Sequence, residues 1–171
     1  MNNAPSLQVI CVSLQTWYDT SFADWQVQKE GQSLILNLNW KRSKLIQTWR
    51  FSLKENYLVW QVDSKLDHPF NLDVFKFGLF LLPEYKTFFC GHQQQDFPGK
   101  FSFWKDMPLE NQKAGLFGLR KQADLPAIVL EGSQELTRII QNSDARNSCR
   151  ILQLSLPKES LLQKEVTMSM Q

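Results

Sequence analysis

Alternation of apolar and polar residues with a period of two dominates the first half of the chain. In Ser33–Trp40, every second residue from Leu34 onward is apolar, and asparagines occupy two of the intervening positions. This alternation is typical of a β-strand with one buried face, because successive side chains point to opposite sides. The same period recurs in Leu45–Leu53 and Tyr57–Leu66. Short polar turns separate these segments, so the sequence predicts an antiparallel meander.

The second half of the chain predicts further strands. Phe70–Leu82 is apolar at most positions, which favours a central strand covered on both faces. Glu135–Gln141 fits both helical and strand spacing, and we assign it to a strand because strand spacing prevails elsewhere. The remaining predicted strands are Glu84–Cys90, Phe101–Trp104, Gly115–Leu119, Pro126–Glu131 and Arg150–Leu156.

Three segments are predicted to interrupt or end this β-structure. The polar run Gly91–Gly99 is predicted as a loop, and Asn142–Asp144 as a turn. Pro157 followed by Lys158–Glu165 predicts a short helix, since proline is tolerated in a first helical turn. The sequence therefore predicts one all-β domain over residues 1–171 with roughly nine to eleven strands. We expect a single antiparallel β-sandwich, with a β-barrel as the alternative and at most two short helices.

Composition and charge exclude several classes of protein. With 43% hydrophobic and 21% charged residues, the 171-residue chain is typical of a globular protein. The net charge of +2 favours neither nucleic acid nor an anionic membrane surface as a partner. Leu7–Leu14 is too short to span a membrane, and no basic segment precedes it as in a signal peptide. The three widely spaced cysteines form no disulfide framework, so we expect a reduced, cytoplasmic protein.

Six tryptophans suggest carbohydrate binding, because indole rings stack on the C–H faces of sugars. Trp40, Trp49 and Trp60 share strand faces with leucines, so we predict that they are buried in the core. Trp104 lies where a predicted strand enters a polar loop, and it is the best candidate for an exposed stacking surface. Side chains that could bind sugar hydroxyls neighbour the tryptophans in sequence: Gln26, Gln28, Asn37, Asn39, Gln47, Arg50 and Gln61.

The segment Cys90–Asp96 combines a histidine, three glutamines and a carboxylate. This segment and Trp104 both interrupt strands of the aromatic second half, so we expect them at the same rim of the fold. In that arrangement Trp104 supplies the stacking face for a sugar. His92, Gln94 and Asp96 then donate or accept hydrogen bonds with its hydroxyls.

The same segment allows two other chemistries. A histidine beside a carboxylate can transfer protons near neutral pH, so His92 with Asp73 or Asp96 could serve an epimerase-like enzyme. No nucleophile elbow or phosphate-binding loop accompanies them. Cys90 and His92 supply only two metal ligands, whereas a protein metal site needs three or four. We therefore expect a non-catalytic protein with no metal and no other cofactor.

Two runs of the sequence follow a strand–turn–strand pattern that resembles a known fold family. The first, Thr48–Phe89, reads TWRFSLKENYLVWQVDSKLDHPFNLDVFKFGLFLLPEYKTFF, and the second reads IIQNSDARNSCRILQLSLP. Together they resemble the galactose-mutarotase-like supersandwich, a large β-sandwich of sugar epimerases and of accessory domains in glycoside hydrolases. The catalytic members are longer and use His and Glu from several strands. This chain has only two histidines, and neither can be matched to that catalytic pair. The resemblance therefore implies a shortened, non-catalytic, sugar-binding version.

Two further function classes stand beside sugar binding and the less favoured epimerase. A barrel could hold a small apolar ligand among its phenylalanines, which are Phe75, Phe77, Phe80, Phe88 and Phe89. Alternatively, an exposed edge strand or aromatic patch could bind a protein or a second copy as a homodimer. The shape of the sheets discriminates between these classes. A closed barrel favours the apolar ligand, an open sheet with surface tryptophan favours a sugar, and a deep polar cleft holding His92 favours the enzyme.

Overall fold

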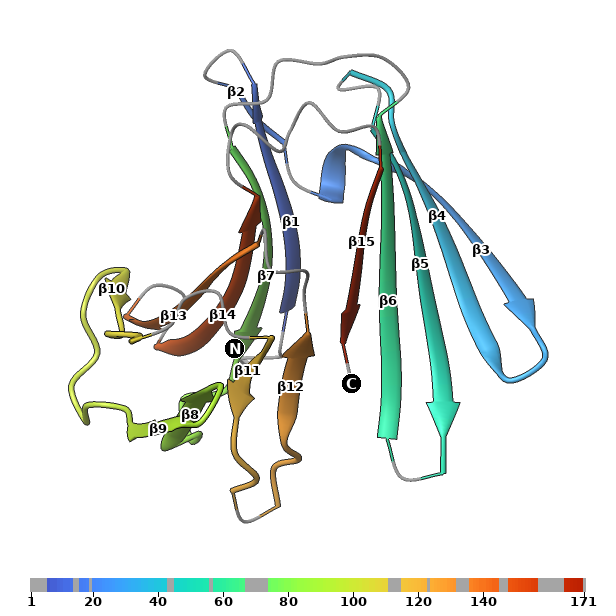
Figure 1. Cartoon of the computed structure of the whole chain (residues 1–171). Helices are drawn as coiled ribbons and strands as arrows, with labels where there is room; N and C mark the ends of the chain where they lie inside the picture. Colours follow the sequence, from blue (N-terminus) through green and yellow to red (C-terminus); the bar gives the residue numbers. More distant parts are fainter. Residues whose placement is uncertain are drawn as a thin grey trace.

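The computed structural model describes residues 6–13, 16–18, 20–42, 45–55, 57–66, 74–110, 115–122, 124–131, 136–144, 148–156 and 165–170. Over these residues the protein is all-β, with fifteen strands in two antiparallel sheets that form an open β-sandwich (Figure 1). The predicted sandwich is confirmed and the barrel alternative is wrong, because neither sheet closes on itself. One short 3-10 helix, η1 (Thr20–Phe22), lies in this described part. No helix within it is long and apolar enough to cross a membrane.

The smaller sheet has six strands in the order β10-β13-β14-β7-β1-β2. Its strands are β1 (Ser6–Ser13), β2 (Thr16–Tyr18), β7 (Val74–Leu81), β10 (Lys105–Asp106), β13 (Thr137–Ser143) and β14 (Cys149–Leu156). β7 pairs with β14 on one side and with β1 on the other. Phe77 and Phe80, which point to opposite faces of β7, are both buried. Val74–Leu81 of the apolar run therefore forms the predicted central strand, and residues 70–73 of that prediction lie outside the described residues.

The larger sheet has nine strands in the order β3-β4-β5-β6-β15-β12-β11-β8-β9. Their bounds are β3 (Asp24–Glu30), β4 (Ser33–Trp40), β5 (Leu45–Lys54), β6 (Tyr57–Leu66), β8 (Thr87–Cys90), β9 (Gln93–Asp96), β11 (Leu116–Leu119), β12 (Ile128–Glu131) and β15 (Glu165–Met170). β4, β5 and β6 pair in succession, which confirms the predicted meander. Figure 1 shows β3 and the meander at one end of this sheet and the β8–β9 hairpin at the other.

The core between the sheets is built around tryptophans of the meander. Trp40, Trp49 and Trp60 are 1%, 3% and 3% exposed, so their predicted burial is confirmed. The rings of Trp49 and Trp60 have centroids 5.2 Å apart and meet edge-on. Trp60 also lies 4.8 Å from Phe77 of β7, a strand of the opposite sheet. Aromatic contact therefore joins the two sheets directly, in addition to the burial of apolar area.

Two predicted irregular segments are in fact strands. Gln93–Asp96, predicted as part of a loop, forms β9 because the chain reverses sharply and pairs with β8. Asn142 and Ser143, predicted as a turn, are the last residues of β13 and pair with Arg150 and Cys149. The described strands outnumber the predicted ones, because β1, β2, β3, β9, β10 and β15 are not predicted by the pattern.

Other predicted elements have mixed outcomes. Phe101–Trp104, predicted as a strand, contains no strand residue, and Trp104 has a positive φ of 46° that a regular strand does not allow. The ambiguous segment forms a strand from Thr137 onward, as assigned. Residues 158–164 of the predicted terminal helix lie outside the described residues, and Glu165 begins β15.

Replacement of Trp49 by alanine tests the core assignment. We expect Trp49→Ala to lower the free energy of unfolding by about 3–5 kcal/mol, because a large buried side chain leaves a cavity. Ile46→Ala on the same strand is the matched control. The Ile46 side chain is 43% exposed on the opposite face. Its removal should therefore lower the free energy of unfolding by under ~1 kcal/mol. Urea unfolding measures both values, and a Trp49→Ala variant with the wild-type midpoint would contradict the assignment.

Candidate functional site

The segment predicted to bind a ligand is a β-hairpin at one edge of the nine-stranded sheet. β8 and β9 pair from Thr87 and Asp96 to Cys90 and Gln93, which leaves Gly91 and His92 as the turn. Gly91 has a φ of 58°, a conformation that glycine adopts without strain and that suits the first position of a two-residue hairpin turn. Strand alternation therefore decides where each side chain after the turn points.

Gln94 and Asp96 lie on the outer face of the hairpin, opposite the core. The Oε1 atom of Gln94 accepts a hydrogen bond of 3.1 Å from Nε of Arg120. The Arg120 guanidinium lies 4.8 Å from the centroid of the Phe89 ring on the same face. Asp96 Oδ1 accepts a hydrogen bond of 2.9 Å from the Thr87 hydroxyl. These two predicted ligand-binding residues are thus held by neighbours within their own sheet.

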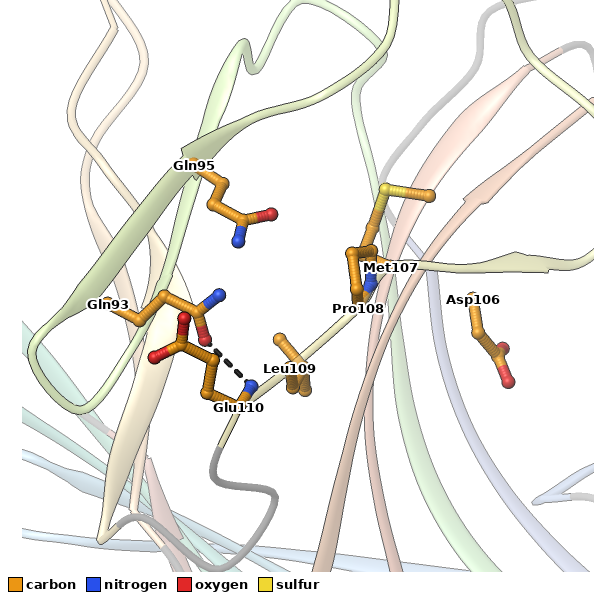
Figure 2. A pocket seen from close by; sticks show the side chains of 7 residues that line it. All are labelled: Gln93, Gln95, Asp106, Met107, Pro108, Leu109 and Glu110. Atoms are coloured by element: carbon orange, nitrogen blue, oxygen red, sulfur yellow. Dashed lines mark hydrogen bonds between the residues drawn. The ribbon is translucent and has the colours of Figure 1, made fainter.

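The alternate residues of β9, Gln93 and Gln95, line a pocket, which we call the β9 pocket (Figure 2). Its other wall is the segment from Asp106 to Glu110, which begins with the last residue of β10. The Oε1 atom of Gln93 accepts a hydrogen bond of 2.9 Å from the backbone N–H of Glu110. The pocket has a volume of about 550 Å³. This volume falls in the range of small-molecule binding sites.

The wall opposite β9 is fixed to the core of the sandwich. Met107 is buried, and its backbone N–H donates a hydrogen bond of 2.7 Å to the carbonyl oxygen of Ile140. Leu109 packs against the core cluster. Asp106 Oδ1 accepts a hydrogen bond of 2.7 Å from Nε2 of Gln141. β13 of the six-stranded sheet therefore holds Asp106 and Met107 of this wall, and the core holds Leu109.

The β9 pocket combines hydrogen-bonding groups with apolar walls. Figure 2 shows Gln93 and Gln95 reaching from β9 toward the facing segment, with Glu110 beside Gln93. An amide both donates and accepts hydrogen bonds, whereas an ionised carboxylate only accepts them. Met107, Pro108 and Leu109 add an apolar surface. Such a set suits a ligand that carries hydroxyl groups on a C–H framework.

Catalytic chemistry finds little support at the hairpin. His92 is exposed in the turn and is not among the residues that line the β9 pocket. Asp73, one predicted acid–base partner, lies outside the described residues. Cys90 is buried, and burial raises the pKa of its thiol more than the nearby Arg138 guanidinium lowers it. The described residues contain no group of three or more His, Cys, Asp or Glu that could hold a metal ion.

Trp104 lies in the turn before β10 and packs on the six-stranded sheet. Its backbone N–H donates a hydrogen bond of 3.4 Å to the Ser143 hydroxyl. Its ring meets Phe80 and Phe103 edge-on, with centroid distances of 6.0 and 6.2 Å. The side chain of Trp104 is 37% exposed and that of Phe103 is 77% exposed. Phe103 and Trp104 therefore form an exposed aromatic surface. That Trp104 binds the same ligand as His92, Gln94 and Asp96 stays a prediction.

Arg150 fixes the loop that precedes this turn. Its guanidinium lies 4.3 Å from the ring centroid of Phe97 and 4.2 Å from that of Phe101. The Nε atom donates a hydrogen bond of 2.9 Å to the carbonyl oxygen of Tyr85, and Nη1 donates one to Asn142 Oδ1. Burial lowers the pKa of Arg150 to about 10, so the group is still protonated at neutral pH. A buried planar cation of β14 thus ties the loop to the six-stranded sheet.

Gln93 and Gln95 are not among the residues predicted to bind a ligand, because Gly91–Gly99 is predicted as a loop. One signal could have found them. A two-residue turn that begins with glycine, directly after an aromatic strand, is typical of a β-hairpin. The strand that follows the turn places alternate glutamines on opposite faces.

Comparison with protein-family models, with characterised proteins and with solved structures gives no match for this chain. The function is therefore inferred from the geometry of the described residues. The resemblance to the galactose-mutarotase-like supersandwich stays a prediction.

The stacked arginine provides a test of how the loop is held. We expect Arg150→Lys to lower the free energy of unfolding by about 1–3 kcal/mol, because an ammonium cannot stack flat between two rings or donate in the same directions. Arg120→Lys is the matched control, since Arg120 contacts one ring on an exposed face. This substitution should lower the free energy of unfolding by under ~1 kcal/mol. Denaturant unfolding gives both values, and equal losses would show that the double stacking adds nothing.

Proposed function

We propose that the protein is a non-catalytic carbohydrate-binding β-sandwich and that the β9 pocket is its sugar site. The observation that carries this proposal is the set of groups around one space: two amides from β9, the Glu110 carboxylate and an apolar wall. A space of about 550 Å³ accommodates a ligand of monosaccharide or disaccharide size.

The hydrogen bonds of the pocket determine which groups remain for a ligand. The Oε1 atom of Gln93 already accepts the N–H of Glu110, so its amide N–H groups serve as donors toward the pocket. Gln95 contributes a donor and an acceptor from the next position on the same face. The Glu110 carboxylate accepts hydrogen bonds from hydroxyl groups. Pro108 and Leu109 offer an apolar surface for the C–H bonds of the ring.

The affinity should be modest, because a sugar loses good hydrogen bonds to water for each one it gains. We expect dissociation constants in the micromolar to millimolar range, about −8 to −4 kcal/mol. The resemblance of Thr48–Phe89 to the galactose-mutarotase-like supersandwich also implies sugar binding.

Two neighbouring glutamines of β9 give a matched test. A glycan array identifies a ligand, and isothermal titration then measures its affinity for the variants. Gln95→Ala should weaken binding by up to about tenfold, because one or two neutral hydrogen bonds are lost. Gln94→Ala should leave the affinity unchanged, since Gln94 lies on the opposite face of the same strand and bonds to Arg120.

Two outcomes would contradict the proposal that the β9 pocket binds the sugar. If Trp104→Ala abolishes binding at an unchanged melting temperature while Gln95→Ala does not, the sugar binds at the exposed Phe103–Trp104 pair. If the array gives no hit at millimolar sugar, carbohydrate binding itself is wrong. An interaction module then becomes the better description of the protein.

A further inference from the structure

β3 is an edge strand of unusual length for this molecule. Among the described strands, the edges are β10, β2, β9 and β3, with two, three, four and seven residues respectively. Short edge strands protect a sheet against pairing with another chain, whereas a long edge exposes a row of unpaired N–H and C=O groups. All seven residues of β3 are exposed at the outer end of the nine-stranded sheet (Figure 1). β3 is therefore the best template for strand addition.

One face of β3 continues the apolar core. Trp25 and Val27 pair with Leu38 and Leu36 of β4 on the inner face, yet they are 44% and 61% exposed. The Trp25 ring meets the buried Trp49 ring edge-on, with centroids 5.4 Å apart. The exposed residues thus extend the aromatic core to the edge of the sheet. Apolar surface beside a free strand edge is typical of an interaction site.

We propose that β3 pairs antiparallel with β3 of a second copy of this chain, with Gln26 on the two-fold axis. The two nine-stranded sheets then join into one continuous sheet. Trp25 lies opposite Val27 of the second copy, and Asp24 lies opposite Gln28 of the second copy. Each pair occurs twice because the interface is symmetric, and directly opposite side chains are in contact.

The sequence of β3 favours this register over its neighbours. A symmetric pairing that keeps both inner faces on one side must be centred on a residue that pairs with itself. Centring on Val27 places Asp24 opposite Glu30, a like-charge pair that destabilises a sheet. Centring on Gln28 places Val27 opposite Lys29. Centring on Trp25 pairs only the three strand residues Asp24, Trp25 and Gln26. Among the registers centred on Gln26, Val27 and Gln28, only the one centred on Gln26 pairs apolar with apolar residues and avoids like charges.

The charges at the ends of β3 do not oppose the approach of a second copy. Asp24 forms an ion pair of 2.6 Å with Lys41, and Glu30 lies 3.8 Å from Arg50. Each carboxylate thus has a cation of its own chain beside it, although such exposed ion pairs do not cancel the repulsion between two carboxylates placed directly opposite each other. Lys29 falls opposite Ala23 in the proposed register, beyond the five paired residues. This self-complementarity makes a second copy the occupant that the edge fits.

Cysteine cross-linking tests the register directly. Gln26→Cys should form a disulfide-linked dimer on mild oxidation, because residues opposite each other in an antiparallel pair have Cα atoms about 4.5–5.5 Å apart, within disulfide range. Gln28→Cys is the matched control on the same face. Its two copies would lie about 13 Å apart along the strands, which is too far for a disulfide. Oxidised wild-type protein shows the background from the native cysteines.

Sedimentation velocity over a range of concentrations tests the interaction without cross-linking. The wild type should shift from monomer to dimer, and Val27→Glu should raise the dissociation constant by about tenfold or more, since a carboxylate would face the Trp25 ring of the second copy. Ile46→Glu is the control for charge, because Ile46 is 43% exposed on β5, away from the edge. It should dimerise like the wild type.

Three results would overturn the proposal: a monomeric wild type throughout, a dimer unaffected by Val27→Glu, or equal cross-linking of Gln26→Cys and Gln28→Cys. Circular dichroism establishes that each variant folds, and if Val27→Glu does not, the cysteine pair decides alone. β9 and β3 are opposite edges of the sheet, so these results are independent of the sugar-binding proposal.

Discussion

Aromatic rings that meet across the core hold the two sheets together. The Trp60 ring of β6 stacks on the Phe51 ring with centroids 5.3 Å apart. Its centroid also lies 4.8 Å from that of the Phe77 ring of β7. β6 and β7 follow one another in the chain but belong to different sheets. Their contact therefore sets how the meander folds over the six-stranded sheet.

The two ends of the nine-stranded sheet are finished in different ways. At the β9 end, polar contacts close the structure: Arg150 binds the loop after β9, and Met107 fixes the pocket wall to β13. At the β3 end, the aromatic core extends to the exposed side chains of Trp25 and Val27. A polar pocket suits a small hydroxylated ligand, whereas a free apolar edge suits another strand. The molecule thus offers two surfaces that could act independently.

Strand alternation also separates residues that the sequence places side by side. Trp25 and Trp49 lie on the inner face of the meander, while the neighbouring amides Gln26 and Asn37 lie on the outer face. Stacking and hydrogen bonding to a sugar therefore cannot combine on one face there. Gln47 does share the inner face, but it is fully buried and donates a hydrogen bond to the Ser64 hydroxyl.

The sequence by itself determined the meander and the burial of Trp40, Trp49 and Trp60, because a period of two is a local property of the chain. Only the tertiary structure decided the β9 pocket, since the turn at Gly91 and His92 selects which glutamines face inward and the opposite wall arrives from a later segment. It likewise decided that β3 is a free edge, because the neighbours of a strand depend on pairings made far along the chain.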